Sequence, residues 1–128
     1  YVSIINRCDY CVQHHLEGMK RLLGDDARSD MIFRALDTST LEPHFTPKET
    51  TGLRYSMLLT KQPCTVTNNH IIELRTSGFD DGEILEINQV VSYFAYANRT
   101  VLGLGVNTRG DILGLSPSSG DTEDWSHQ

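Results

Sequence analysis

Residues 8–23 read CDYCVQHHLEGMKRLL and carry a strong helical pattern. Steps of three and four residues fall on one face of a helix. The apolar and thiol-bearing residues follow such steps: they are Cys8, Cys11, Val12, His15, Leu16, Met19, Leu22 and Leu23. The pattern predicts a helix from about Cys8 to Leu23, ended by Gly24, with the cysteine-bearing face turned inward.

Two thiols and an imidazole share this face, because Cys8, Cys11 and His15 have Cys-x-x-Cys-x-x-x-His spacing. His15 lies one turn beyond Cys11, where it can take the thiol proton. A helix beginning near Cys8 would also bring its N-terminal amides to a thiolate in the first turn. The spacing therefore predicts thiol chemistry.

The motif is also compatible with plain core packing and with zinc binding. Buried free cysteines often serve as small apolar core residues. The alternative is a non-enzymatic scaffold in which Cys8, Cys11 and His15 bind zinc. A structural zinc ion has four ligands, so one more would have to come from Cys64, His14, His70 or another chain.

Length and charge limit the functional classes. The chain has 128 residues, which suits one domain, and 11 basic against 17 acidic residues give a net charge of −6. Lys and Arg do not cluster, so we expect neither nucleic acid nor an anionic membrane surface as a partner. No apolar run approaches the roughly 20 residues of a membrane span. Three cysteines with this spacing suit a reducing compartment, and we expect a cytoplasmic protein.

Start and stop signals predict further helices. Residues 1–5 suit either a short strand or the end of a helix, and Asn6 and Arg7 suit a break after this segment. The other signals, in chain order, are a cap at Asp25 or Asp26, a capping box from Thr46 to Glu49, a stop before Pro63, a cap at Thr65 or Thr67, a stop at Gly78, and a capping-box-like start at Asp80 with Glu83.

The helix expected after Asp80 is the longest and most apolar. Its apolar stripe is broad, which predicts contacts on more than one side or with another subunit. We expect Tyr93, Phe94 and Tyr96 to be packing residues, and Arg99 to form an ion pair between helices or subunits.

Two regions follow from these patterns. Residues 1–106 form the helical domain, and because Tyr1 begins an apolar stretch without an initiator Met, we expect its N-terminal part to be missing. Residues 107–128 lose the helical period and hold several Gly, Ser and Pro residues. Since Leu113, Leu115 and Trp125 are apolar, we expect this tail to lie along a surface or a neighbouring subunit.

Three stretches carry a resemblance to a known family. They are SIINRCDYC at 3–11 with His15, LRTSGFDDGEI at 74–84, and YFAYANR at 93–99 followed by GLGV at 103–106. The chain resembles the AhpD-like, carboxymuconolactone decarboxylase superfamily, in particular its peroxidase-related (alkylhydroperoxidase) branch. The resemblance implies an all-α orthogonal helical bundle that assembles into a homo-oligomer, a trimer or a trimer of dimers.

The resemblance also implies reduction of alkyl hydroperoxides by a dithiol, without a cofactor or metal. Position by position, Cys11 would be the peroxidatic thiolate, Cys8 the resolving thiol and His15 the histidine of the proton relay. Tyr10 stands where members can carry a second histidine, and we expect it to orient a water or a donor. The relay glutamate of the characterised members would precede Tyr1.

The implied partners are a hydroperoxide substrate and a thiol or lipoyl-type reductant. A disulfide oxidoreductase without strong peroxidase activity is the alternative enzyme. A decarboxylase-type lyase fits less well, because a Cys-x-x-Cys is not expected to serve that reaction. The residues leave open the roles of Cys64, His70 and Arg99.

Overall fold

A computed structural model of the chain describes residues 1–115, and every regular element in this range is helical. The predicted all-α class is therefore confirmed. The part of the predicted tail that contains Trp125 lies outside the described residues. The elements are α1 (Val2–Ile5), α2 (Asp9–Leu23), α3 (Asp26–Asp37), α4 (Pro47–Lys61), the 3-10 turn η1 (Pro63–Thr65), α5 (Asn68–Thr76) and α6 (Asp81–Leu104). None of these helices is long and apolar enough to cross a membrane.

The helix ends follow local signals in the sequence. Gly24 ends α2 with a left-handed φ of 61°, which glycine adopts without the steric cost of a Cβ. Asp25 then caps α3 by accepting a hydrogen bond from the backbone N–H of Arg28. Thr67, rather than Thr65, precedes α5. These boundaries agree with the predictions.

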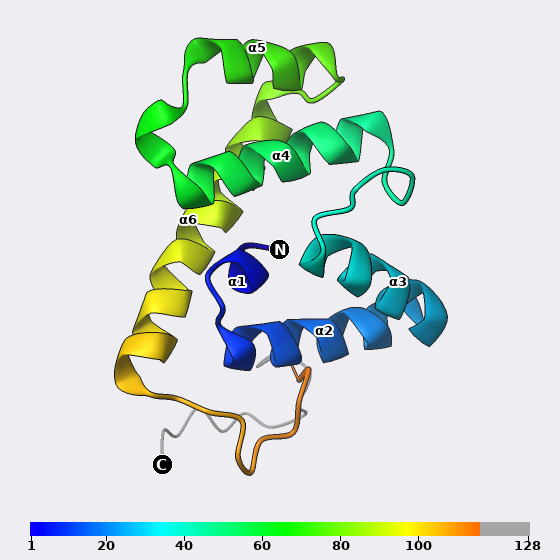
Figure 1. Ribbon diagram of the computed structural model, residues 1–128, viewed down its shortest axis with the longest axis vertical. Coiled ribbons are helices and arrows are strands. Elements are labelled where there is room, and N and C mark those ends of the chain that lie inside the picture. The colour runs from blue at the N-terminus through cyan, green and yellow to red at the C-terminus, as the bar shows by residue number, and fades with distance from the viewer. Residues whose placement is uncertain (116–128) are drawn as a thin grey trace.

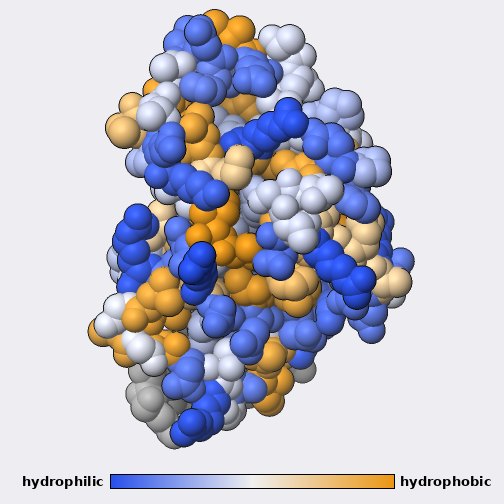
Figure 2. All heavy atoms as spheres, viewed as in Figure 1, coloured by the Kyte–Doolittle hydropathy of each residue, from blue (hydrophilic) through white to orange (hydrophobic). Residues whose placement is uncertain are grey.

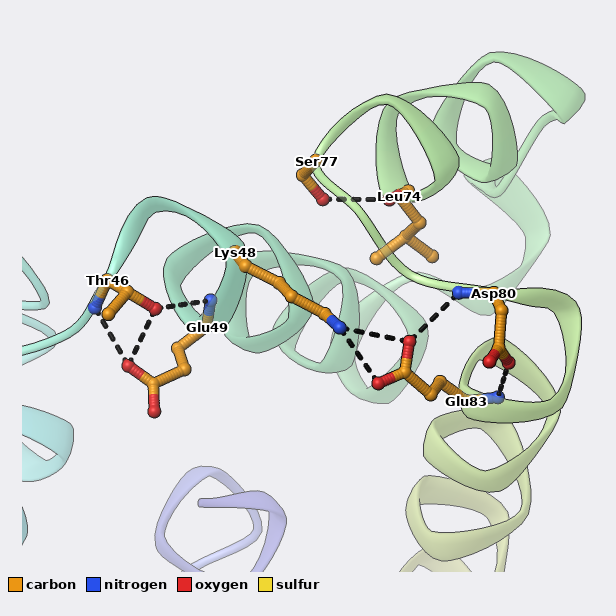
Figure 3. Close-up of polar contacts among 7 residues, drawn as sticks. All are labelled: Thr46, Lys48, Glu49, Leu74, Ser77, Asp80 and Glu83. Atoms are coloured by element: carbon orange, nitrogen blue, oxygen red, sulfur yellow. Dashed lines mark hydrogen bonds and ion pairs between the residues drawn. The ribbon is translucent and has the colours of Figure 1, made fainter.

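Two capping boxes and an ion pair fix the first turns of α4 and α6 to each other (Figure 3). Thr46 and Glu49 form the box of α4, and Asp80 and Glu83 form that of α6. Lys48 on α4 lies between the boxes, with its Nζ 2.8 Å from Oε1 of Glu83. Glu83 thus belongs to the capping box of α6 and is also the ion-pair partner of Lys48 on α4.

The N-terminal segment is a helix and not a strand. After α1, Arg7 adopts a left-handed φ of 55°, and the backbone N–H of Cys8 donates to the carbonyl of Ser3 over 2.9 Å. This tight turn reverses the chain into α2. Because α1 packs against α2, α4 and α6, it lies in the middle of the molecule (Figure 1).

The remaining helices form two groups on either side of α1 (Figure 1). The first group, α4, α5 and the start of α6, shares a core of Tyr55, Leu74 and Ile84. In the second group, α2 packs against α3. The two groups meet through α1 and the later part of α6.

A cavity of about 600 Å³ lies between α1, α2, α3, α4 and α6. Its lining is mainly apolar and includes Leu16, Phe33, Leu53, Ile87 and Phe94. Figure 2 shows hydrophobic residues gathered across the middle of the same face, between the two helix groups. The fold therefore contains an apolar space large enough for a small organic molecule.

The beginning of the predicted tail lies along α2 of its own chain. Thr108 donates to Gln13, His14 lies 3.1 Å from Asp111, and Arg21 donates to the carbonyl of Leu113. The three contacts span more than two turns of α2. Residues 107–115 are thus held against the outer side of the helix that carries the cysteine motif.

The long helix α6 is less buried than its apolar stripe suggests. Ile84 and Val91 are buried, but Tyr93 and Tyr96 are 61% and 69% exposed in the single chain. These two tyrosines thus do not pack in the interior of the single chain, and their packing against another subunit stays a prediction. Phe94, between them, lines the cavity.

Candidate active site

The structure brings the two motif cysteines together at the start of α2. Cys8 is the N-cap residue and is fully buried, and Cys11 lies in the first turn with 6% exposure. Both are free thiols, three residues apart at the first turn of the helix, and each affects the ionisation of the other. Two neighbouring reduced thiols can form a disulfide after oxidation of either one.

Burial has the largest effect on the pKa of the Cys11 thiol. Desolvation, followed by the neighbouring Cys8 thiol, raises the pKa of the Cys11 thiol to about 11. The Asn98 side chain and the backbone N–H of Cys11 act in the opposite direction with smaller effect. The stabilisation of a thiolate by the helix N-terminus stays a prediction.

A polar network around Asn98 joins α1 and the turn that follows it to α6. Asn98 is fully buried; its Nδ2 donates to Oγ of Ser3, and its Oδ1 accepts from Nδ2 of Asn6, each over 3.0 Å. Asn98 was not among the site residues predicted from the sequence. The available signal was one polar residue on the same face as Val91 and Phe94, seven and four residues before it.

His15 lies one turn beyond Cys11, with its ring directed to the cavity. The imidazole packs edge-on against Phe94, with 4.8 Å between ring centroids, and it forms part of the cavity wall. Partial burial, with a smaller effect from the neighbouring His14, lowers the pKa of His15. The ring is therefore neutral at pH 7 and able to accept a proton.

Tyr10 lies beside the outer edge of the thiol pair, next to the tail. Its ring centroid is 4.5 Å from that of His14, whose Nε2 lies 3.1 Å from Oδ2 of Asp111. Burial and the charge of Asp111 raise the pKa of Tyr10. Tyr10 thus stays protonated, and its neighbour His14 links the start of α2 to residues 107–115.

Three residues whose roles the sequence left open lie away from the thiol pair. Cys64 is exposed in η1. His70 accepts a hydrogen bond from the backbone N–H of Thr67 and so serves the start of α5. Arg99 is exposed and donates to the carbonyl of Ala95 on its own helix. Within residues 1–115 it forms no ion pair with another helix, and an ion pair with another subunit stays a prediction.

The motif does not form a metal site by itself. Within residues 1–115, no three His, Cys, Asp or Glu side chains are grouped so that they could hold a metal ion. His15 is among the residues that line the cavity, and Cys8 and Cys11 are not. The arrangement suits a dithiol better than a zinc centre.

No protein-family model matches the chain, and no curated protein sequence is significantly similar to it.

Proposed function

We propose that this protein is a thiol-dependent oxidoreductase that reduces organic hydroperoxides through Cys11 and Cys8. The observation that carries the proposal is the placement of two buried free thiols, Cys8 and Cys11, at the start of α2, one helical turn before a neutral His15 on the wall of an apolar cavity. The likeness of the motif to the AhpD-like, carboxymuconolactone decarboxylase superfamily supports the same reaction. The apolar lining suits an organic substrate.

The reaction balances with a dithiol as the electron donor. The Cys11 thiolate attacks the distal oxygen of a hydroperoxide, the O–O bond breaks, and the alkoxide takes one proton to leave as an alcohol. Cys11 becomes a sulfenic acid. The Cys8 thiol then forms a disulfide with Cys11 and releases water, and an external dithiol, of the simple thiol or lipoyl type, reduces the disulfide.

The acid–base properties make the proposed reaction slow at neutral pH. With a pKa of about 11, only about one Cys11 in ten thousand is a thiolate at pH 7. A proton acceptor near the thiol would offset this, and we assign that role to His15. The same high pKa favours the second candidate function, disulfide exchange without strong peroxidase activity. In that reaction an external dithiol attacks the Cys8–Cys11 disulfide, so the first step needs no Cys11 thiolate.

The exposed face of α6 supports a proposal of homo-oligomerisation. Leu85, Tyr93, Tyr96 and Leu104 are exposed large apolar or aromatic side chains on this helix. Such surfaces are common at interfaces between subunits. The family resemblance implies a trimer or a trimer of dimers, and the cysteine pattern supports a cytoplasmic location.

Thiol mapping tests the proposed function. The reduced protein is treated with one equivalent of an organic hydroperoxide, and its cysteines are analysed by mass spectrometry. We expect a disulfide between Cys8 and Cys11 in the wild type and a sulfenic acid on Cys11 in Cys8→Ser. Cys64→Ser is the matched control, because Cys64 is an exposed thiol outside the site, and it should react like the wild type.

Two outcomes would contradict the proposal. Unchanged peroxide consumption in Cys11→Ser would assign the reaction to another group. Formation of the Cys8–Cys11 disulfide only with disulfide reagents, and not with hydroperoxide, would favour the second candidate. Equal reactivity toward both reagents would support a peroxidase that also exchanges disulfides.

A further inference from the structure

Phe94 connects the helix that carries the cysteine motif to the wall of the cavity. Its ring on α6 stands almost perpendicular to the imidazole of His15 on α2, at an interplanar angle of 83° and with 4.8 Å between the ring centroids. Both side chains line the cavity, and α2 packs against α6. The contact therefore joins two helices that lie far apart in the sequence, at the side chain that we assign as the proton acceptor.

Phe94 is itself held from its other side. The ring of Tyr93 stands at 78° to that of Phe94, with 5.3 Å between the ring centroids. Val91, three residues earlier on the same face of α6, is buried. Perpendicular pairs of aromatic rings are favourable beyond the apolar area that they bury. Tyr93, Phe94 and His15 thus form a row of rings from the exposed side of α6 to the cavity wall.

The contact with Phe94 is what orients the His15 ring within the described part of the chain. The rings of His14 and His70 each take part in a hydrogen bond. Within residues 1–115, the ring of His15 has the aromatic contact and no hydrogen bond. A general base beside a nucleophilic thiol is usually oriented by a third group. At His15, an aromatic ring takes the place of that group.

We propose that Phe94 is a positioning residue that holds the imidazole of His15 in the cavity wall, one helical turn beyond Cys11. The inference rests on the proposed function, in which His15 accepts the proton of the Cys11 thiol. Phe94 takes no proton and acts only through His15. It adds a residue from α6 to a site that the motif places on α2.

The titratable surroundings of His15 are separate from the Phe94 contact. They are Cys11 and His14 on α2, Tyr1 before α1, and Glu83 and Glu86 on α6. The residues of α3 and α4 that line the cavity do not titrate. Replacing Phe94 by leucine leaves all these groups in place, so a change at His15 can be assigned to the lost ring.

A double-mutant cycle tests whether Phe94 acts through His15. The rate of Cys11 oxidation at saturating cumene hydroperoxide is measured for wild type, Phe94→Leu, His15→Gln and the double variant. Phe94→Leu should react about tenfold more slowly, because a displaced base transfers the proton less efficiently. In the His15→Gln background, Phe94→Leu should cause no further loss. Phe94→Tyr keeps the ring and should react at a rate close to that of the wild type.

Phe45→Leu is the matched control for the loss of a phenylalanine ring. Phe45 is half-buried before α4 and does not line the cavity, so this variant should react like the wild type. An equal loss from Phe94→Leu with and without His15 would overturn the inference, because Phe94 would then act by packing alone. A folded Phe94→Leu with the wild-type rate would overturn it as well.

NMR tests the contact without peroxide. The ring protons of His15, identified by the loss of their signals in His15→Gln, should show nuclear Overhauser cross-peaks to the ring protons of Phe94 in the wild type. In Phe94→Leu, the pKa of His15 should rise toward the ordinary value of about 6.5, because burial lowers it in the folded chain. Absence of the cross-peaks would overturn the inference even if Phe94→Leu does not fold.

The inference and the proposed function can fail separately. A wild type that is inert to cumene hydroperoxide, but shows the cross-peaks and the rise of the His15 pKa in Phe94→Leu, would refute the peroxidase and leave Phe94 as the residue that positions His15. Reduction of the hydroperoxide without these cross-peaks would support the peroxidase and refute the role of Phe94.

Discussion

Nδ2 of Asn6 lies 3.0 Å from Oδ1 of Asn98, although 92 residues separate them in the sequence. Asn6 belongs to the turn between α1 and α2, and Asn98 to the later part of α6. The contact fixes the turn that leads directly into Cys8. The thiol pair therefore owes its position to the C-terminal helix as well as to its own helix, and its properties depend on how tightly these segments pack.

The first prediction concerns stability at alkaline pH. The pKa of folded Cys11 is about 11, above the value of about 8.5 for a free cysteine. The folded state thus binds this proton more tightly than the unfolded chain. Its contribution to stability is complete below about pH 8.5 and is lost as the pH rises through about 11.

Urea unfolding of the reduced protein at increasing pH measures this effect. The midpoint of the wild type should fall over this range, and Cys11→Ser should show a weaker pH dependence because serine does not titrate there. Cys64→Ser, at an exposed position, should behave as the wild type. Parallel curves for Cys11→Ser and wild type would show that Cys11 does not carry the effect.

The second prediction concerns the core shared by α4, α5 and α6. Leu74 is fully buried between Tyr55 and Ile84. Leu74→Ala should reduce the free energy of unfolding by about 2–5 kcal/mol, because it leaves a cavity as well as removing apolar contacts. Ile72→Ala is the matched control, since Ile72 lies on the same helix and is 48% exposed. Denaturant titrations should show a clearly smaller loss for Ile72→Ala, and equal losses would contradict this account of the core.

The third prediction concerns the ion pair between Lys48 and Glu83. The hydrogen bond with Lys48, followed by one with the backbone N–H of Asp80, lowers the pKa of Glu83. An acid with a lowered pKa contributes stability above its unfolded pKa of about 4.3, and this contribution is lost as the pH falls. Lys48→Met should therefore lower the thermal midpoint at pH 7 and flatten its decline at acidic pH.

Salt provides the check on this interpretation. The pair is about two-fifths exposed, so about 1 M NaCl should screen it and reduce the difference between Lys48→Met and wild type. Lys61→Met, at the opposite end of α4, should not show the same salt-dependent difference. A deficit in Lys48→Met that persists in salt would point instead to its contact with the Phe79 ring, 4.6 Å away.

The fourth prediction concerns the start of the tail. Gly114 has a φ of 73°, and a Cβ there would lie 2.6 Å from the backbone nitrogen of Gly18 on α2. Gly114→Ala should release residues 107–115 from α2, and their amide hydrogens should exchange faster with solvent. Gly110→Ala carries a similar strain at φ 90° but meets no atom within 4 Å. If both variants exchange equally fast, backbone strain and not the close contact with α2 controls the segment.

Local signals made most of the helix boundaries predictable. The cap at Asp25, the capping boxes at Thr46 and Asp80, and the end of α2 at Gly24 all involve partners within four residues. Such interactions form in the same way whatever the rest of the chain does. The relative placement of Cys8 and Cys11 is also a local property, because three- and four-residue steps bring residues to one side of α2.

The helices, their caps and the pair of neighbouring thiols could be predicted from the amino-acid sequence, because these features depend on residues close together in the chain. The surroundings of the thiol pair depend instead on long-range packing. Ser3 and Asn98, 95 residues apart, are joined by a hydrogen bond between α1 and α6. Packing of such distant segments removes water from Cys11, and this desolvation raises the pKa of its thiol, which the residues near Cys11 in the sequence do not reveal.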